Sequence, residues 1–582
     1  MKNLLYILII ASFCSCSKDF LDRNPTTDLN NNTFWNTEAD LKSFSNGIYN
    51  DAGNNALYTF YLGFTNIPFG SATHAVVPYE VSSDNHASLA AEHIAFARVS
   101  AGQNFVATNA SDAGWNWGIL RKCNIMLRNY TKAQILESIR NNYAGEAYFF
   151  RAWFYLDKVQ NFGDVPYVSK PLDNTSEELF EARQPRKQVM DSVLRDIDMA
   201  INYLPASWST PGRVNKYVAL ALKSRLCLYE GTYRKYHNLG DYEKYLNQCV
   251  DASALLMSSG KYSLYKTGNT AADYKTLFVT KDLSTNPEVI FSRAYVQGVL
   301  THNMSGYVAS QLAGPTRDFV EDFLCLESDG SAKPVALSTA YSNSTMEAEF
   351  NNRDPRLKQI VLDPREEQAV FKTQVGYPRL QGMQGNVSPT GYHLIKYYDY
   401  NQMLLSTNQD TDAPLFRYAE VLLNFIEAKA VLGQATKTDL DQSVNLVRRR
   451  AGVPDLTMTP VADPKYAGLG LDPLVVEIRR ERRVELCYEQ LRYQDLMRWK
   501  MGAQLNKQVL GIRFEPTDRA NPKFAAVSSS VKTTTVNGKN YIDVLASSEL
   551  RNRKFTESKN YLFPIPINVI SKNPAIGQNP DW

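Results

Sequence analysis

The sequence lacks the short motifs that identify many classes of enzyme. It has no HExxH zinc motif, no G-x-S-x-G nucleophile elbow, no Walker phosphate loop and no Cys-x-x-Cys pair with zinc-ligand spacing. Of its six histidines, only His86 and His93, seven positions apart, can share a helix face and bind a metal, and packing is the favoured interpretation. A glycosidase needs only two carboxylates at a set separation, so the missing motifs favour a binding protein without excluding an enzyme.

Cysteine is also scarce, and neither sign of charge is in large excess. Apart from two cysteines near the N-terminus, five are scattered, odd in number and mostly set in apolar helical stretches, which predicts buried thiols and no disulfide framework. The formal net charge of +3 is small for 582 residues, so nothing indicates a nucleic-acid-binding surface. The scattered cysteines are Cys123, Cys227, Cys249, Cys325 and Cys487.

Only one long apolar run occurs, and it lies at the N-terminus. This run, Leu4–Phe13, is shorter than the roughly 20 residues of a transmembrane helix and follows a lysine, a pattern typical of a signal peptide. The chain turns polar directly after Cys16, and a small residue precedes that cysteine, so we expect removal of residues 1–15 and lipidation of Cys16. Cys14 is the competing acceptor, and an ordinary secretory cleavage elsewhere is the alternative. The mature chain is expected to be soluble and tethered to a membrane.

Apolar residues recur with helical spacing in two long parts of the chain. Phe149, Trp153 and Leu156 follow the i, i+4, i+7 pattern, and Phe162-Gly163 ends that helix. Helices of roughly 15–25 residues joined by short Gly/Pro turns resemble helical-hairpin repeats such as tetratricopeptide arrays, although the 34-residue consensus is absent. We therefore predict a mainly α fold, a tetratricopeptide-like helical-hairpin scaffold with long loop-rich insertions. The predicted helices are 114–130, a second segment ending at 162, 186–204, 214–236, 241–259, 416–433, 439–452 and 474–500.

Between residues 262 and 412 the helical spacing is lost. Gly, Pro, Asn, Ser and Tyr accumulate there, and loops of this length in a compact protein are usually functional or disordered. The many aromatic residues argue against disorder. Aromatic residues form 12% of the chain, 34 of them Tyr, more than a core requires, which indicates a recognition surface.

The last predicted helix contains a basic run of the kind that nucleic-acid-binding proteins use. Several glutamates are interleaved with its arginines three or four positions away, and such charges can pair along a helix. We therefore interpret this segment as scaffold and predict no nucleic-acid partner. The charged residues are Arg479, Arg480, Arg482, Arg483, Glu477, Glu481, Glu485 and Glu489.

Eight segments, taken in order, resemble the SusD/RagB family of outer-membrane nutrient-binding lipoproteins. Their order and spacing make the resemblance specific, and together they cover nearly the whole chain. The segments are SCSKDFLD (15–22), FWNTEADLKSFSNGIYN (34–50), GEAYFFRAWFYLDKVQNFGDVP (145–166), RVNKYVALALKSRLCLY (213–229), LFRYAEVLLNFIEAKAVLG (415–433), VNLVRRRAGVP (444–454), ERRVELCYEQLRYQDLMRW (481–499) and YLFPIPINVISKNPAIGQNPDW (561–582).

The resemblance implies a single SusD-like domain over 16–582, built on a right-handed stack of tetratricopeptide-like helical pairs. Its helical scaffold would cover about 34–261 and 413–500, its loop-rich ligand region about 262–412, and a C-terminal cap about 501–582. The resemblance also implies an outer-membrane location facing the exterior and a partner, a SusC-like TonB-dependent transporter on which the lipoprotein sits as a lid. The family's usual ligands are glycans, and a minority of members bind peptides or other nutrients.

Charged and polar residues within these shared segments are predicted to support the scaffold. Ionisable side chains among Phe, Tyr and Leu predict buried or half-buried ion pairs between helices. The polar C-terminal residues are predicted to pack on the body as a cap, since so polar a tail would otherwise fray. The first set is Glu146, Arg151, Arg417, Glu420 and Glu427, and the second is Asn573, Gln578, Asn579 and Pro580.

A sugar-binding site needs flat aromatic faces that stack on pyranose rings and polar groups that bond the hydroxyls. Two loop-rich stretches, 58–88 and 293–318, contain both, and the family's ligand contacts come from these regions, although no contact residue transfers by motif. Packing is the alternative for each aromatic residue. The candidates are Phe69, His74, Tyr79, Asp84, Asn85 and His86 in the first stretch, Tyr295, Gln297, His302, Asn303, Tyr307 and Arg317 in the second, and Tyr341 after it.

The leading hypothesis is a non-enzymatic lipoprotein without cofactor or metal that binds oligosaccharide at the cell surface and delivers it to the transporter. The nearest alternative is a binder of peptides or another nutrient. A surface glycoside hydrolase and a purely structural helical-repeat adaptor are the alternatives from other classes.

Overall fold

The computed structural model describes residues 34–50, 64, 76–310, 312–373, 376–385 and 387–582. Helices dominate these residues, and short strands pair in small sheets. The predicted fold class, mainly α with helical hairpins and loop-rich insertions, is confirmed. Cys16, Phe69 and His74, for which we predicted a role, lie outside the described residues.

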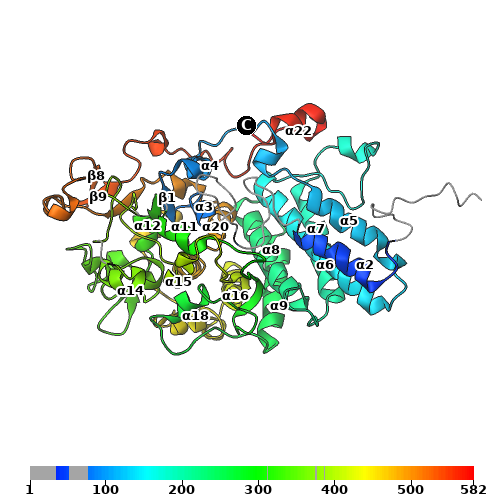
Figure 1. Cartoon of the computed structure of the whole chain (residues 1–582), viewed down its shortest axis with the longest axis horizontal. Helices are drawn as coiled ribbons and strands as arrows, with labels where there is room; N and C mark the ends of the chain where they lie inside the picture. Colours follow the sequence, from blue (N-terminus) through cyan, green and yellow to red (C-terminus); the bar gives the residue numbers. More distant parts are fainter. Residues whose placement is uncertain (1–33, 51–63, 65–75, 311, 374–375, 386) are drawn as a thin grey trace, which may run out of the picture.

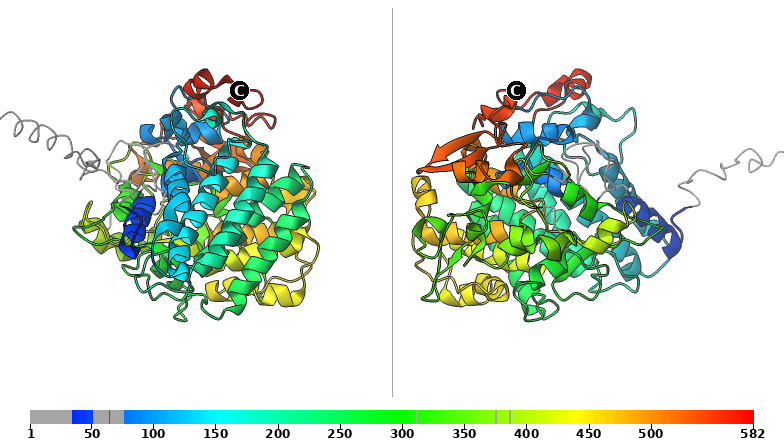
Figure 2. Two further views of the ribbon diagram at one scale, coloured as in Figure 1. Left: turned by 90° about the vertical axis from the view of Figure 1, so that its right-hand side faces the viewer. Right: turned by 60° about the vertical axis from the view of Figure 1, so that its left-hand side comes forward.

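Long helices packed in antiparallel pairs form one side of the molecule (Figure 1). They are α2 (Glu38–Asn50), α5 (Gly118–Asn129), α6 (Glu137–Phe162), α7 (Arg186–Tyr203), α8 (Lys216–Tyr236), α9 (Tyr242–Ser258) and α16 (Tyr418–Val431). Helix α6 packs along α7, and α8 along α9, while α2 and α5 lie beside α6, and α16 lies beside α9. Figure 2 shows these helices standing next to one another when that side faces the viewer. The hairpin array that the sequence predicts is therefore present.

Local sequence explains where several of these helices begin and end. The side chain of Asn215 accepts hydrogen bonds from the backbone N–H groups of Tyr217 and Val218 and so caps the start of α8. Helix α6 ends at Gly163, whose φ of 73° lies in a region that glycine adopts without strain. Gly163 thus ends the helix, as the sequence predicts.

The predicted helix 474–500 is wrong as one element, because the structure divides it into α19 (Pro473–Glu485) and α20 (Arg492–Arg498). Tyr488 and Gln490, at φ 59° and 64°, reverse the backbone between them. The break places the Tyr488 ring in a second apolar core, where it is fully buried. The predicted helix 439–452 is likewise divided, into α17 (Lys437–Asp441) and α18 (Val444–Ala451).

The second core lies under the part of the chain where helical spacing is lost. Its apolar side chains come from segments that are far apart in sequence, and they include Phe96, Phe323, Tyr397 and Phe514. The short helices are α3 (Val76–Glu80), α4 (Ile94–Ser100), α10 (Asp273–Leu277), α11 (Met304–Ser310), α12 (Arg317–Val320), α13 (Leu357–Ile360), α14 (Glu367–Phe371), α15 (Tyr400–Leu404), α21 (Pro516–Arg519) and α22 (Ile567–Lys572).

The strands of the described residues form four small antiparallel sheets, and two of these, β1–β3 and β2–β6, join segments that are distant in sequence. Strand β1 pairs with β3, β2 with β6 and β4 with β5, and β9 lies between β7 and β8 in a three-stranded sheet. The strands are β1 (His86–Ser88), β2 (Val289–Arg293), β3 (Ala313–Pro315), β4 (Cys325–Leu326), β5 (Ala332–Lys333), β6 (Ala413–Arg417), β7 (Leu510–Arg513), β8 (Thr533–Val536) and β9 (Lys539–Asp543).

The C-terminal residues pack on the helical array as predicted. The amide of Asn579 donates to the backbone oxygens of Phe162 and Phe563, and its oxygen accepts a bond from Arg183 at 2.6 Å. The amide of Asn573 donates to the oxygen of Leu179 at 3.1 Å. These bonds hold the chain end against the ends of the hairpin helices.

The five scattered cysteines are buried and free, as the sequence predicts. Among the residues that the structure describes, no helix is long and apolar enough to cross a bilayer. In the same part of the chain, no group of three or more His, Cys, Asp or Glu side chains has an arrangement that would hold a metal ion.

Candidate functional site

The two candidate loop regions lie side by side. Strand β1 of the first region pairs with β3 of the second, so that His86 faces Pro315. The Thr316 hydroxyl donates to the backbone oxygen of Asp84 at 2.6 Å. The pairing joins segments more than 200 residues apart in sequence, and Tyr79, Tyr295 and Tyr307 from the two regions contribute to the second core or pack against it.

The candidates of the first region bond to α19, α20 and the turn between them. Asp84 accepts two 2.8 Å bonds from the Arg492 guanidinium, and Asn85 accepts one at 2.7 Å from Arg483. His86 shares a 2.9 Å bond with the Tyr488 hydroxyl. The half-buried Tyr79 accepts a bond from Gln494 at 3.2 Å. These polar groups have partners inside the protein.

The aromatic candidates of the second region are buried in the same way. The Tyr295 hydroxyl donates to the backbone oxygen of Phe64 at 2.5 Å. His302 bonds the backbone oxygen of Thr411 at 2.9 Å, and Tyr307 bonds His93. Asn303 is also buried. These side chains hold the loops together.

Gln297 is the exposed candidate among those that the structure describes. It lies at the tip of a short hairpin closed by an antiparallel bridge between Val296 and Leu300. Val296 and Val299 beside it are 56% and 83% exposed, so the tip presents apolar and amide groups to solvent together. Of the candidates that the structure describes, Gln297 therefore has the most accessible side chain.

Arg317 and Tyr341 gather away from this hairpin, around Tyr541 of β9. The Arg317 guanidinium lies 3.6 Å from the centre of the Tyr541 ring and pairs with Glu321 at 2.5 Å. The Tyr341 hydroxyl donates to Glu349 at 3.3 Å. The candidate residues thus form two groups, and ligand contact by either group stays a prediction.

His86 and His93 do not share a helix face. His86 lies on β1, whereas His93 ends the single turn Ala91–His93. Burial lowers the pKa of His86 to about 3 and that of His93 to about 4, so both rings are neutral near pH 7. Both histidines are buried and hydrogen-bonded within the protein.

The arginines of α19 are buried, and the prediction that they pair along their own helix is wrong for most of them. Only Arg480 has a partner on α19, Glu477 at 3.0 Å. Arg482 pairs with Asp495 of α20 at 2.8 Å, and Arg483 pairs with Asp322 at 2.5 Å. The helix lies between the two cores, and its charged side chains therefore meet carboxylates from surrounding segments.

Asp322 is the centre of this network. Its carboxylate also accepts bonds from Lys465 at 2.7 Å and from the Tyr466 hydroxyl at 2.8 Å. Burial alone would raise the pKa of Asp322, but Lys465, Arg483 and Arg480 outweigh it and hold that pKa well below the usual range. The carboxylate is thus charged throughout the physiological range.

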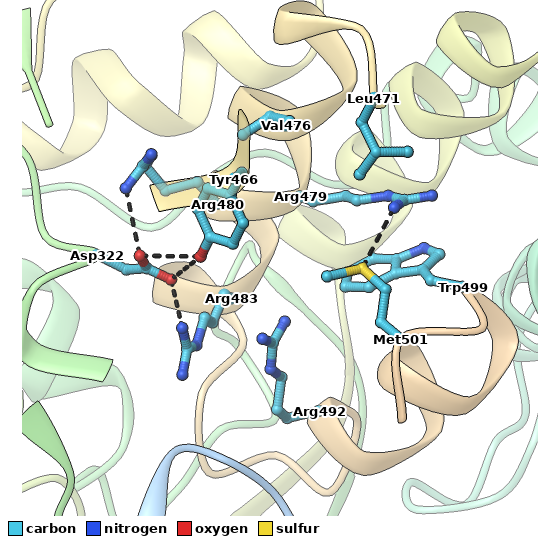
Figure 3. Close-up of a pocket in the computed structure, with 10 residues that line it drawn as sticks. All are labelled: Asp322, Tyr466, Leu471, Val476, Arg479, Arg480, Arg483, Arg492, Trp499 and Met501. Carbon is cyan, nitrogen blue, oxygen red and sulfur yellow. Dashed lines mark hydrogen bonds and ion pairs between the residues drawn. The ribbon is translucent and has the colours of Figure 1, made fainter. Parts of the chain in front are cut away.

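A pocket opens between α19, α20 and the segment before α19 (Figure 3). Its cavity volume is about 20 Å³, which is room for about one water molecule unless a lining side chain moves. Figure 3 shows Arg480 and Arg483 directed toward Asp322, whereas Arg479 lies on the opposite side, above Met501 and Trp499. The lining residues are Asp322, Tyr466, Leu471, Val476, Arg479, Arg480, Arg483, Arg492, Trp499 and Met501.

This pocket was not predicted, although the sequence around Arg479 contains one indication of it. Within α19, the residues three and four positions from Arg479 are Val475, Val476, Arg482 and Arg483, none of which is acidic. An arginine without an acidic neighbour on its own helix must find a partner elsewhere or remain unpaired.

Comparison with known proteins identifies the class to which this fold belongs. The family model described as "SusD family" matches residues 267–582, and one described as "Starch-binding associating with outer membrane" matches residues 19–228. The first model alone covers more than half of the chain. The protein therefore belongs to the SusD family, whose glycan-binding members are non-catalytic, and the family resemblance seen in the sequence is confirmed.

Individual relatives agree over nearly full length. SusD-like protein P2 of Formosa agariphila is 23% identical over 514 residues, which cover 86% of this chain and 91% of that protein. A SusD-like carbohydrate-binding protein of Bacteroides fragilis has the same fold, with a TM-score of 0.73, 23% identity, and coverage of 94% of this chain and 100% of the other. Surface glycan-binding protein A of Bacteroides fluxus matches with a TM-score of 0.60 and 19% identity over 94% of this chain and all of its own.

Proposed function

We propose that this protein binds oligosaccharide at the cell surface and delivers it to a SusC-like TonB-dependent transporter in the outer membrane. The observation that supports this most strongly is the family match along both halves of the chain, one half of it to a model for starch-binding proteins associated with the outer membrane. Solved proteins of this fold include a carbohydrate-binding protein and a surface glycan-binding protein. A binding role, with no chemical step, suits a family that is non-catalytic.

Cys16 is proposed as the lipid anchor. It follows a short apolar run and a small residue, and it precedes a polar segment, which is the order of a lipoprotein signal. The anchor would place the folded domain at the outer surface, where a nutrient is met before it enters the transporter.

The ligand surface is proposed to form where the two loop regions meet. Gln297 and the exposed hairpin around it would contact the sugar, since an amide can bond hydroxyls in both directions. His86 and Tyr307 are buried, Asp84 is half-buried, and all three are bonded within the protein, so they would position the loops. Phe69 and His74 stay candidates from the same region.

Calorimetry on the purified, detergent-solubilised protein tests this proposal. A panel of neutral and acidic oligosaccharides should contain at least one that binds with measurable heat, while unrelated peptides give none. Gln297→Ala should weaken that binding, and the matched control Gln434→Ala, an exposed glutamine after α16, should leave it unchanged. Heat from peptides with none from any glycan would replace the glycan proposal with a peptide-binding one, and release of product from a polysaccharide would indicate an enzyme.

A further inference from the structure

Arg479 is a buried cation without an anionic partner among the described residues. Its side chain is 5% exposed and lies in the wall of the pocket shown in Figure 3. The three other arginines of the pocket each have a carboxylate within 3.3 Å: Asp322 for Arg480 and Arg483, and Asp84 for Arg492. Arg479 is thus the one pocket arginine without a carboxylate at salt-bridge distance among the described residues, and Glu427 and Asp495 act on its charge only from farther away.

The hydrogen-bonding capacity of Arg479 is also largely unused. A guanidinium has five N–H donors in one plane, yet Nε and Nη2 are buried without a partner in the described residues. Nη1 donates to the thioether of Met501 at 3.5 Å, and a thioether is a weak acceptor. Burying such donors unsatisfied costs free energy, so a stronger acceptor at this position would stabilise the folded protein.

Two aromatic rings contact the Arg479 guanidinium, but they satisfy only part of its bonding capacity. The Arg479 guanidinium lies 4.4 Å from the centre of the Trp499 ring and 4.8 Å from that of Tyr236. Rings attract a cation through their faces and do not accept its N–H groups. The Tyr236 hydroxyl also interacts with Arg479, yet Nε and Nη2 keep no hydrogen-bond partner at bonding distance among the described residues. The open acceptor positions therefore lie in the plane of the guanidinium, beside Nε and Nη2, and the weak Met501 acceptor occupies the neighbouring position at Nη1.

We propose that this pocket binds an oxyanion, a carboxylate or sulfate group, which pairs with Arg479 and takes the position of the Met501 thioether. Two oxygens of such a group match two adjacent N–H donors of a guanidinium. Leu471, Val476 and Trp499 form apolar walls that leave few competing acceptors. Met501 is a flexible, unbranched side chain, and its displacement opens the path to the buried donors. The proposal stands independently of glycan binding at the loops.

Thermal unfolding in different salts tests the proposal on the full protein. Sodium sulfate, compared with sodium chloride of equal ionic strength, should raise the melting temperature of the unaltered protein more than that of Arg479→Gln. Binding to the folded state stabilises only the unaltered protein, whereas the general stabilising effect of sulfate acts on both. A rise of equal size in both proteins would overturn the proposal. Acetate and glucuronate, added in the same way, show whether a free ion or an acidic sugar binds better. Equal melting temperatures in all four salts would overturn the proposal.

Two substitutions locate the effect. Arg479→Gln should raise the apparent Kd for the best anion at least about tenfold, the effect of losing one charge-assisted pair. The control Arg449→Gln, which removes an exposed arginine paired with Asp455, should leave that Kd unchanged. Met501→Ala should tighten binding several-fold by removing the competing thioether. Weaker anion binding by Met501→Ala, or equal loss with the Arg449 control, would contradict the proposed position.

A crystallographic measurement does not depend on any variant folding. Crystals of the unaltered protein grown with selenate should show an anomalous peak within hydrogen-bonding distance of Arg479 and a shifted Met501 side chain. A pocket without a peak, with Met501 still bonded to Arg479, would overturn the proposal.

Discussion

Arg417 illustrates how single charged residues connect the two cores. It is 1% exposed, and its guanidinium bonds Glu288 at 2.5 Å, Glu485 at 3.0 Å and Glu489 at 2.8 Å. Burial disfavours its charge, but the three carboxylates outweigh burial and raise its pKa well above the usual value. The arginine therefore stays charged, and its neighbours depend on it.

Replacing Arg417 with Ala is expected to lower the free energy of unfolding by about 3–5 kcal/mol, because it leaves buried carboxylates without their cation. Arg449→Ala, which removes a pair whose side chains are 49% and 41% exposed, should cost about 0–1 kcal/mol. Denaturant titration of both variants measures the difference. Equal costs would show that the buried pairs contribute no more than surface pairs.

Glu80 gives a prediction about pH. Its carboxyl is buried and accepts a 2.5 Å bond from Asn85, and burial raises its pKa to about 7. The unfolded value is roughly 4.3, so between these values the folded state holds the extra proton and stability falls as pH rises. The free energy advantage of Glu80→Gln should thus grow by up to about 1.4 kcal/mol per pH unit between about pH 5 and 7. A pH-independent difference would refute the raised pKa.

The sequence predicted burial of the charged residues better than it predicted their partners. Apolar neighbours indicate that Arg417 is buried, and that prediction is confirmed. Its partner Glu288, 129 positions away, depends on β2 pairing with β6, which no local pattern specifies. The α19 arginines show the same limit. Glutamates on the same helix suggested pairs within it, but Arg483 pairs with Asp322 and Arg482 pairs with Asp495.

At the scale of elements, the long helices were predictable and the breaks were not. Helices α7, α8 and α9 follow the 3.6-residue spacing between Gly and Pro stops, so their predicted bounds agree with the structure within a few residues. The turn after α19 exists because Tyr488 and Glu489 reach contacts in distant segments. The three-residue strands β1 and β3 are too short to show strand alternation.

Gly231 tests the packing of one hairpin. An added Cβ there would meet Leu246 of α9 at 2.7 Å, so Gly231→Ala should force α8 and α9 apart and lower the free energy of unfolding by about 1–3 kcal/mol. Gly468→Ala, where nothing lies within 4 Å of the added Cβ, should change it by less than about 0.5 kcal/mol. Thermal or denaturant unfolding compares the two. A Gly231 variant as stable as the control would contradict close packing at this point.

On the scale of the whole molecule, a helical array and a loop-rich half share one chain of the SusD family. The order of shared segments made the family and the helical fold predictable from the sequence. The ligand surface was less predictable, because aromatic residues serve both cores and binding sites. Tyr295, His302 and Tyr307 are of the right type, yet they are buried and bonded inside the second core.

The proposed anchor leads to a prediction about location. Cys16→Ser removes the thiol that would be acylated, so the protein should move from the membrane fraction to the soluble fraction. The control Cys14→Ser removes the competing cysteine and should leave the protein with the membrane. Immunoblotting of fractionated cells measures both. Membrane retention of the Cys16 variant would remove the anchor from the proposed function.

The uptake of a labelled oligosaccharide by intact cells tests most directly whether this protein captures glycan for a transporter. The probe is the fluorescent form of the oligosaccharide that binds most tightly in calorimetry. Cells that produce the protein should accumulate the label, cells without it should accumulate much less, and Cys16→Ser should resemble the cells without it. Equal accumulation in all three would contradict surface capture by this protein.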